Sequence, residues 1–322
     1  MDGGHQMRIT ALCGGLGGAR FALALAHKGL EDRTTLVTNV ADDWVVDGLL
    51  VCPDTDAVLY ALSGRLDEDR GWGIRGDEFP PAPSGAGSWF NLGVQDRAHH
   101  VRRAQLLEGG ADLAAATATL GREAGIVARV VPASLVPRGS VIVTEAGTSA
   151  FQEWLVRDHA GPAVLDVHWP GPPIPSPGAV AALDEADVVV LTSSSPVASL
   201  EPTLALEGVR AALAARKADG RPVVLVSPVV STPPELERDR RRHHARAALL
   251  AARGVAHEPI AVVEHFADVI TAVVLDPADA GLVPALPSGV TGSTAPILAQ
   301  DGVSRAALVE ACIAGVRTRT VS

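Results

Sequence analysis

The sequence predicts a doubly wound α/β fold, in which a mostly parallel, Rossmann-like sheet carries a helical insertion. The first observation is an apolar run, residues 7–13, that stops at a glycine cluster. The second is the segment behind it, because a helical stretch at 21–26 and a β-branched run at 34–40 complete a βαβ unit. The third is a pair of later apolar runs, 186–192 and 222–227, which end in small polar residues as buried parallel strands do beside a ligand site.

The domain organisation is predicted from length and regularity. The chain has 322 residues, enough for one large α/β domain with an insertion. We expect a disordered leader at 1–6 and a single α/β domain over 7–322. Within this domain a less regular stretch, about 65–180, is interpreted as the insertion. It contains a possible helix at 111–120 and a proline-rich linker at 170–178.

Charge and composition exclude several classes of protein. Lysine and arginine number 27 and aspartate and glutamate 37, which gives a net charge of −10. This acidity disfavours binding to nucleic acid or to an anionic membrane surface. No apolar stretch approaches the roughly 18 residues of a membrane helix and no secretory signal is visible, so we expect a cytoplasmic protein. Three cysteines without a CxxC pair fit neither a disulfide framework nor a zinc ribbon.

A glycine loop separates the first expected strand from the first expected helix. Glycines permit a tight turn and a close approach of backbone N–H groups to an anion, which the helix N-terminus also attracts. Arg20 stands where a GxGxxG motif needs glycine or alanine, and Asn39 stands where an acidic residue would bind a ribose. A nicotinamide dinucleotide is therefore disfavoured, and a tight turn without any ligand is the alternative to phosphate binding. The residues expected to bind phosphate are Gly14, Gly15, Leu16, Gly17 and Gly18.

Four carboxylates follow the second expected strand and so lie at the same sheet edge as the glycine loop. Carboxylates beside a phosphate site commonly hold Mg²⁺, which keeps waters and phosphate oxygens as its other ligands. One of them could instead accept the proton of an attacking hydroxyl. Loops and helix N-caps also use aspartate freely, which is the structural alternative. The four, which fall within fifteen residues, are Asp42, Asp43, Asp54 and Asp56.

A series of motifs, in a fixed order along nearly the whole chain, resembles the 2-phospho-L-lactate transferase family of coenzyme F420 biosynthesis. The resemblance is closest to the actinobacterial branch, which uses a phosphoenolpyruvyl donor. The motifs are GGLGGAR at 14–20, NVADD at 39–43, GL at 48–49, CPDTDAVLY at 52–60, GWG at 71–73, WFNLG at 89–93, FQEW at 151–154, SP at 195–196 and VRAAL at 209–213.

The resemblance implies an activity. The family joins a phospholactyl or phosphoenolpyruvyl group from a guanosine diphospho donor to the 5-deazaflavin alcohol FO, and GMP leaves. Phosphoryl transfer of this kind needs positioning and a divalent cation more than covalent chemistry from the protein. The expected partners are therefore the two small-molecule substrates and Mg²⁺, with neither nucleic acid nor membrane, in a homodimeric transferase.

The resemblance also implies roles for particular residues. Asp42, Asp43 and Asp54 would hold the metal. Asp43, Asp54 and Asp56 would form the catalytic set. The glycine loop, together with Ser194 and Ser195, would hold the diphosphate of the donor. The residues implied to contact the acceptor are Asp56, Gln95 and Arg97.

Three segments depart from the family pattern. Gln95 replaces an arginine that would meet the deazaflavin, and Arg97 or Arg103 are the nearest cations that would compensate. The serine run 193–195 lacks the asparagine of the family, and the segment 231–237 lacks its lysine and glycine. Because these two segments are expected beside the donor nucleotide, two alternatives stay open. In the first alternative the chain is a regulatory protein that binds a nucleotide sugar. In the second it is a divergent paralogue with another substrate.

Overall fold

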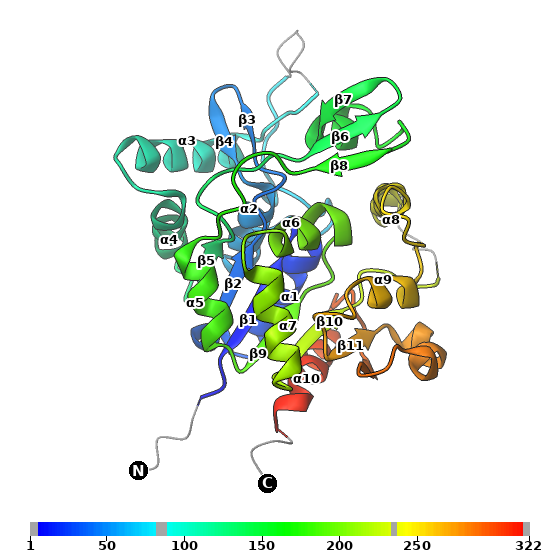
Figure 1. Ribbon diagram of the computed structural model, residues 1–322. Coiled ribbons are helices and arrows are strands. Elements are labelled where there is room, and N and C mark those ends of the chain that lie inside the picture. Colours follow the sequence, from blue (N-terminus) through cyan, green and yellow to red (C-terminus); the bar gives the residue numbers. More distant parts are fainter. Residues whose placement is uncertain (1–5, 82–88, 233–236, 318–322) are drawn as a thin grey trace, which may run out of the picture.

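The computed structural model describes residues 6–81, 89–232 and 237–317 (Figure 1). Its centre is a seven-stranded sheet in the order β12-β11-β10-β9-β1-β2-β5, and every neighbouring pair of strands runs parallel. The predicted doubly wound α/β class is confirmed. The strands are β1 (Ile9–Cys13), β2 (Thr34–Thr38), β5 (Arg129–Pro132), β9 (Val188–Leu191), β10 (Val223–Val226), β11 (Ala272–Leu275) and β12 (Thr291–Thr294).

The central strands form where the apolar runs predicted them. All five residues of β1 are buried, and the strand lies between β2 and β9, with Ala11 opposite both Leu36 and Val190. Side chains alternate between the two faces of a strand, so both faces of this buried sheet need apolar side chains. The continuous apolar runs at 186–192 and 222–227 are β9 and β10 for this reason.

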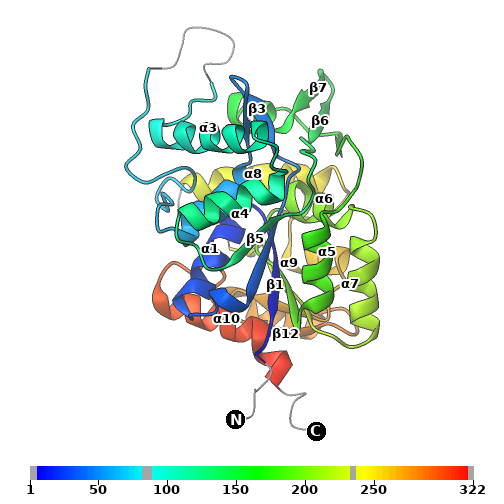
Figure 2. The ribbon, with the colours of Figure 1, turned by 90° about the vertical axis from the view of Figure 1, so that its left-hand side faces the viewer.

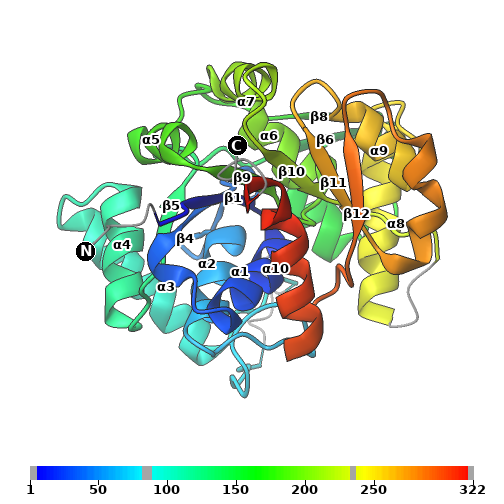
Figure 3. The ribbon, with the colours of Figure 1, turned by 90° about the horizontal axis from the view of Figure 1, so that it is seen from below.

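Helices cover both faces of the sheet (Figure 3). On one face Phe21 and Val58 belong to a cluster with side chains of the helices α1, α2, α4 and α10, and on the other face α5, α7, α8 and α9 contribute to a second cluster. The α-helices are α1 (Gly15–His27), α2 (Pro53–Leu62), α3 (Val94–Glu108), α4 (Leu113–Glu123), α5 (Pro177–Glu185), α6 (Glu201–Leu204), α7 (Val209–Ala218), α8 (Glu237–Ala251), α9 (Pro259–His265) and α10 (Gly302–Arg317). The other helical turns are η1 (Glu31–Arg33), η2 (Glu153–Arg157), η3 (Pro196–Leu200) and η4 (Pro277–Ala285).

Additional elements stand above the carboxyl ends of the strands (Figure 2). They are the helix α3, a hairpin of β3 (Trp44–Val46) with β4 (Leu49–Val51), and a three-stranded antiparallel sheet in the order β7-β6-β8. We call this sheet, β6 (Val141–Thr144), β7 (Gly147–Ala150) and β8 (Asp166–His168), the cap. The stretch 65–180 thus contains an antiparallel sheet as well as the helices α3 and α4, and it also supplies β5 to the main sheet.

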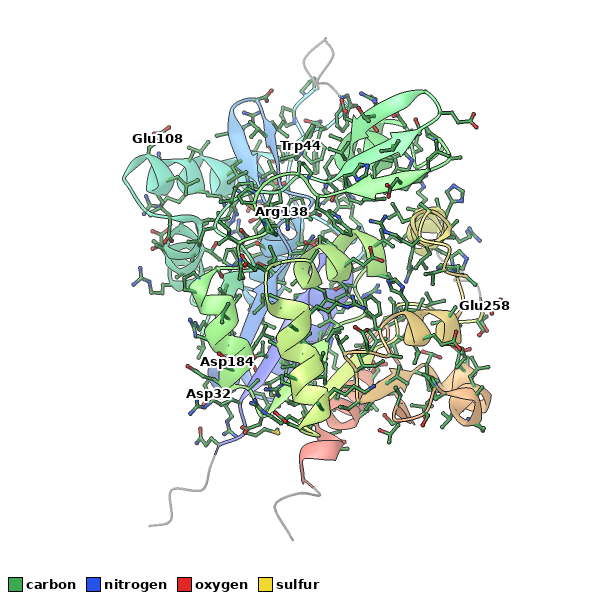
Figure 4. All side chains as sticks on the ribbon, viewed as in Figure 1. Asp32, Trp44, Glu108, Arg138, Asp184 and Glu258 are labelled. Carbon is green, nitrogen blue, oxygen red and sulfur yellow. The ribbon has the colours of Figure 1, made fainter. Side chains whose placement is uncertain are left out.

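The strand order fixes where a ligand site is expected. From β1 the chain runs outward through β2 and β5 in one direction and through β9 to β12 in the other. Ligands of such sheets bind outside the carboxyl ends of the strands, where the order reverses. Trp44 and Arg138 lie toward this end of the molecule, whereas Asp32 and Asp184 mark the opposite end (Figure 4).

Two predictions concern the ends of the chain, namely a disordered leader and a single domain that begins directly after it. The leader predicted at 1–6 falls, except for its last residue, outside the described residues, and the single domain over 7–322 stays a prediction. Among the helices that the structure describes, none is long and apolar enough to span a membrane.

Candidate active site

The glycine loop joins β1 to α1 at the point where the strand order reverses. Gly15 has φ +49°, a left-handed conformation that residues with a side chain rarely adopt. Gly17 has no room for a side chain, because a Cβ there would overlap the carbonyl oxygen of Ser193. Glycine is therefore required at these two positions by the turn and by the approach of α1 to the segment after β9.

Protein groups already bind two amides of this loop. Gly14 N donates a hydrogen bond of 2.7 Å to Ser194 Oγ, and Gly15 N donates to Asp54 Oδ1. The amides of Leu16 and Gly17 lie in the first turn of α1, where a helix offers them no acceptor. Those two amides are the ones that an anionic ligand would contact first. The structure brings Ser194 to the loop, whereas Ser195 Oγ accepts from Ala198 N at 3.2 Å and caps η3.

Asp54 is held beside the loop by Asn39, the residue that follows strand β2. Asn39 Nδ2 donates to Asp54 Oδ2 at 3.0 Å and to Ala198 O at 3.1 Å, so it joins α2 to η3. Burial raises the pKa of Asp54 to about 6, although the hydrogen bonds from Asn39 and Gly15 favour its charged form. The carboxylate occupies the place at the helix N-terminus where the partial positive charge is greatest.

Asp42 and Asp43 complete a set of three buried carboxylates. Burial and the neighbouring charges of Asp54 and Asp43 raise the pKa of Asp42 well above its usual range. Burial also raises the pKa of Asp43, and the positive charge of Arg103 offsets this only in part. Within the described residues, Asp42 Oδ1 and both carboxylate oxygens of Asp43 are buried without a hydrogen-bond partner. Such unpaired buried oxygens are costly unless a ligand or a proton balances them.

These carboxylates fit a divalent cation of the magnesium type. In the described part of the chain, no three His, Cys, Asp or Glu side chains are arranged as a complete metal site. Mg²⁺ does not need such a cage, because it is usually bound by one or two carboxylates together with water and substrate phosphates. Asp42 and Asp54 lie within hydrogen-bonding reach of each other, and a cation between them would balance both charges. Asp42 and Asp54 are thus the ligands that the geometry offers.

Asp56 lies in the same helical turn as Asp54 but has different surroundings. Arg103 forms an ion pair with it, His99 Nε2 lies 3.0 Å from Asp56 Oδ1, and Cys52 N donates to Oδ2 at 3.2 Å. Against the burial that opposes its charge, Arg103 and His99 hold the pKa of Asp56 well below its usual range. Both oxygens of Asp56 are therefore committed to protein donors.

Gln95 and Arg97 lie on the exposed side of α3. Gln95 Oε1 accepts from Arg65 at 3.4 Å, and Arg97 pairs with Asp47 at the tip of the β3–β4 hairpin. Arg103, the other cation expected to compensate for Gln95, is fully buried.

We call the segment 41–43, which carries Asp42 and Asp43, the acidic turn. A cavity of about 270 Å³ opens between the acidic turn and the cap. Its lining includes Asp42, Asp43 and Trp44 on one side and residues 139–141 and 148–153 on the other. Trp44 packs against two further aromatic rings, with centroid distances of 5.1 Å to Trp89 and 4.9 Å to Phe90. Two of the three buried carboxylates and Trp44 therefore border the same cavity, which Gln95 and Arg97 do not line.

Comparison with known proteins decides the family. The sequence model of the 2-phospho-L-lactate transferase CofD family matches residues 9–286. This chain belongs to the CofD family. The expected resemblance is thereby confirmed, and the chain is a transferase of the family that serves coenzyme F420 biosynthesis.

Curated relatives cover nearly the whole CofD-family chain. A phosphoenolpyruvate transferase of Kitasatospora aureofaciens is 36% identical over 96% of this chain and 97% of its own length. One of Thermobifida fusca is also 36% identical, over 95% of this chain and 97% of its own length. A crystal structure of a UPF0052-family protein from Bacillus halodurans aligns with a TM-score of 0.56 at 16% identity, covering 90% of this chain and 93% of that one. The last likeness concerns the fold alone.

Two residues that flank strands of the cap, Ser140 and Gln152, anchor the acidic turn of this CofD-family chain, and neither was expected to be a site residue. Ser140 Oγ donates to Ala41 O at 2.7 Å, and Gln152 Nε2 donates to Asp42 O at 3.4 Å. Both contacts join residues about a hundred positions apart in sequence, so local patterns did not predict them, although Gln152 lies in the FQEW motif. The buried residues of α3 could have been predicted from the sequence, because the spacing of Asp96, His100 and Arg103 places them on one helical face.

Proposed function

We propose that this chain joins a phosphoenolpyruvyl or phospholactyl group from a guanosine diphospho donor to FO and releases GMP. The observation that carries the proposal is the set of three buried aspartates, Asp42, Asp43 and Asp54, beside the N-terminus of α1. Phosphoryl transfer depends on positioning and charge balance, which such a set supplies together with a cation. The relatives named phosphoenolpyruvate transferases support the phosphoenolpyruvyl group as the one transferred.

The donor would bind across the crevice between β1 and β9. The amides of Leu16 and Gly17 would contact its diphosphate at the positive end of α1. Ser194, which binds both N and O of Gly14, would keep the loop in the conformation that presents these amides. The nucleoside would extend toward η3, past the serine run 193–195 that departs from the family pattern. Most of the other departing segment, 231–237, lies outside the described residues.

Mg²⁺ would be held by Asp42 and Asp54, with Asp43 beside them. When bound, the ion supplies positive charge to the diphosphate oxygens as the bond to GMP breaks. Asn39 orients Asp54 for this role, and Ser140 and Gln152 hold the main chain of the acidic turn. Hydrogen bonds thus hold the Asp54 carboxylate and the main chain that carries Asp42.

The acceptor would enter the cavity beneath the cap. Its flat deazaflavin ring suits the aromatic cluster at Trp44, and its terminal hydroxyl would lie toward Asp43. In the reaction, the hydroxyl oxygen bonds to the β-phosphorus of the donor, the bond from that phosphorus to GMP breaks, and the hydroxyl proton passes to a carboxylate. Asp43 borders the cavity and has an elevated pKa, which suits it to take this proton.

The direct test is incubation of the chain with FO, Mg²⁺ and either the enolpyruvyl or the lactyl guanosine diphosphate donor, followed by mass spectrometry. We expect a phosphodiester of FO and one equivalent of GMP, and chelation of the metal should abolish both. Formation of neither product with either donor would overturn the proposed transfer.

The same experiment addresses the open alternatives. A chain that binds guanosine diphosphate or a nucleotide sugar, as measured by calorimetry, but forms no product would be a binding protein. Turnover of another acceptor would indicate a divergent paralogue. The homodimer stays a prediction, which sedimentation of the purified chain tests directly.

A further inference from the structure

Helix α3 attaches to the rest of the molecule through an unusual face. Its buried residues are Asp96, His100 and Arg103, which are all polar or charged and are spaced four and three residues apart. Helices normally bury an apolar stripe against the core. A helix that buries charges instead is held by directed hydrogen bonds and ion pairs, so its position is specific to the groups that it meets.

Arg103 is the centre of this face. Its side chain is fully buried, and Nη1 donates to Leu50 O at 3.1 Å and to Asp56 Oδ2 at 3.2 Å. The second terminal nitrogen, Nη2, pairs with Asp56 Oδ1. A guanidinium presents its donors in a fixed planar fork, so these contacts determine the relative positions of the two groups that it binds.

The two residues that Arg103 binds, Leu50 and Asp56, lie on either side of a short segment of the chain that contains Asp54. Leu50 belongs to β4, the second strand of the hairpin that follows Asp42 and Asp43, and Asp56 lies in the first turn of α2. Asp54 stands between them in sequence. Cys52 N, in the connection from β4 to α2, donates to Asp56 Oδ2 at 3.2 Å.

We propose that Arg103 is a positioning residue, which holds the hairpin and the first turn of α2 in register so that Asp43 and Asp54 reach the reacting groups. The inference rests on the proposed function for what those aspartates do. Arg103 does not touch substrate itself, because it is fully buried and lies outside the cavity lining. Its positive charge also favours the ionised form of Asp43, which adds an electrostatic contribution to the geometric one.

Arg102 is a matched control on the same helix. It is the next residue, and it forms an ion pair with Glu123 at 2.6 Å in which both side chains are more than 40% exposed. Loss of an exposed pair changes stability little. Arg102→Met and Arg103→Met therefore remove the same chemical group from neighbouring positions, one exposed and one buried.

A second variant separates positioning from folding. Arg103→Met alone leaves Asp56 buried without its partner, which destabilises the fold. The double variant Asp56→Asn with Arg103→Met leaves no unpaired charge, and its carboxamide at position 56 keeps an oxygen for the amide of Cys52. We therefore expect its unfolding midpoint to return toward the wild type. Arg103→Lys keeps the charge but loses the fork and should recover part of the function.

The test combines three measurements on the wild type and these variants: Mn²⁺ affinity by calorimetry, steady-state kinetics with FO and donor, and hydrogen–deuterium exchange of residues 39–56. In the double variant we expect Mn²⁺ affinity and kcat to fall by about 10- to 100-fold, the range for residues that orient metal ligands. The KM for FO should rise as well, because Trp44, which would contact the deazaflavin, lies in the hairpin that Arg103 holds. Exchange at 39–56 should rise, whereas Arg102→Met should match the wild type throughout.

Each outcome decides between the possibilities. A double variant that folds and keeps wild-type Mn²⁺ affinity, kcat and exchange would overturn the positioning role. If the wild type forms no product, the proposed function fails, and Arg103 is judged by Mn²⁺ affinity and by exchange at 39–56. If the wild type binds no Mn²⁺, the metal site fails, and exchange together with kcat decides.

Discussion

Asp54 and Asp56 stand two residues apart in the first turn of α2, yet their surroundings are opposite. Asp54 faces the glycine loop beside Asp42, and burial raises its pKa to about 6. Asp56 faces α3, where Arg103 and His99 hold its pKa well below the usual range. Both carboxylates are almost completely buried, so exposure does not distinguish them.

The difference lies in what balances each charge. Around Asp56 the protein itself supplies the balancing cation, Arg103, so no ligand is needed to balance the charge of this carboxylate. Around Asp42 and Asp43 the described residues leave buried carboxylate oxygens without hydrogen-bond partners, which costs the folded protein free energy. Asp54 accepts hydrogen bonds at both oxygens, but no cation of the protein pairs with it among the described residues. Buried carboxylates whose pKa values are raised, as those of Asp42, Asp43 and Asp54 are, are typical of functional sites. The comparison separates Asp56, whose charge the protein balances, from the carboxylates that we propose to bind ligands.

The largest effect on stability is expected at the compensated carboxylate. Asp56→Asn leaves the guanidinium of Arg103 buried without a counter-charge, and we expect the free energy of unfolding to fall by about 3–5 kcal/mol. Urea unfolding measures this, and Glu123→Gln, which breaks the exposed pair with Arg102, is the control with an expected change below about 1 kcal/mol. Similar losses for both variants would contradict the distinction.

The same substitution at an uncompensated carboxylate should have the opposite effect on stability. Asp43→Asn removes a buried charge without a hydrogen-bonded partner among the described residues, so the thermal midpoint should rise. Turnover should fall about 10²-fold or more, because that charge serves the transferred group and its metal. Kinetics and thermal unfolding on one preparation measure both. Full activity with unchanged Mg²⁺ dependence would refute the assignment.

Proton linkage gives a third contrast. The folded pKa of Asp54, about 6, lies above its unfolded value near 4, so stability is lost as pH rises from about 4 to about 6, by about 3 kcal/mol at most. The folded pKa of Asp56 is lowered, so its contribution is lost as pH falls below about 4. We expect Asp54→Asn, compared with the wild type without metal, to remove the loss between pH 4 and 6. If the stability of the variant and of the wild type changed in parallel between pH 4 and 6, the raised pKa of Asp54 would be contradicted.

The smallest change in stability is expected at the exposed cation of α3. Arg97→Gln breaks a surface pair with Asp47 and should alter the free energy of unfolding by less than about 1 kcal/mol. Titration of FO, followed by deazaflavin fluorescence, then tests the acceptor role that the resemblance implies. Weakening by about 1.5–3 kcal/mol would support a charged hydrogen bond to FO, and unchanged affinity would remove Arg97 from the acceptor site.

Substitution of the glycine loop tests structure more than ligand binding. At Gly17 an added Cβ would overlap the carbonyl oxygen of Ser193, so Gly17→Ala should destabilise the fold as well as weaken donor binding. At Gly15 an added Cβ would make only an ordinary contact with Asp54 Oδ1, at 3.6 Å, but φ is positive, and we expect Gly15→Ala to cost about 1–2 kcal/mol of stability. Thermal unfolding of the two variants distinguishes the steric cause from the conformational one.

The sequence by itself determined four strands of the main sheet (β1, β2, β9 and β10), the glycine loop and the acidic segment, whereas β5, β11 and β12 were not predicted. Continuous apolar runs predict buried parallel strands because both faces of such a sheet are covered, and glycine between a strand and a helix predicts a tight turn that admits an anion. The order of motifs also predicted the family, which the match over residues 9–286 confirms.

The tertiary structure decided which carboxylate meets which charge. Asp54 and Asp56 look alike in sequence, and their surroundings differ because α3 brings Arg103 to one of them from 47 residues away. The anchoring of the acidic turn by Ser140 and Gln152 likewise joins distant segments. Electrostatic balance in a buried site depends on distances between groups far apart in the chain, and local patterns of residues do not contain those distances.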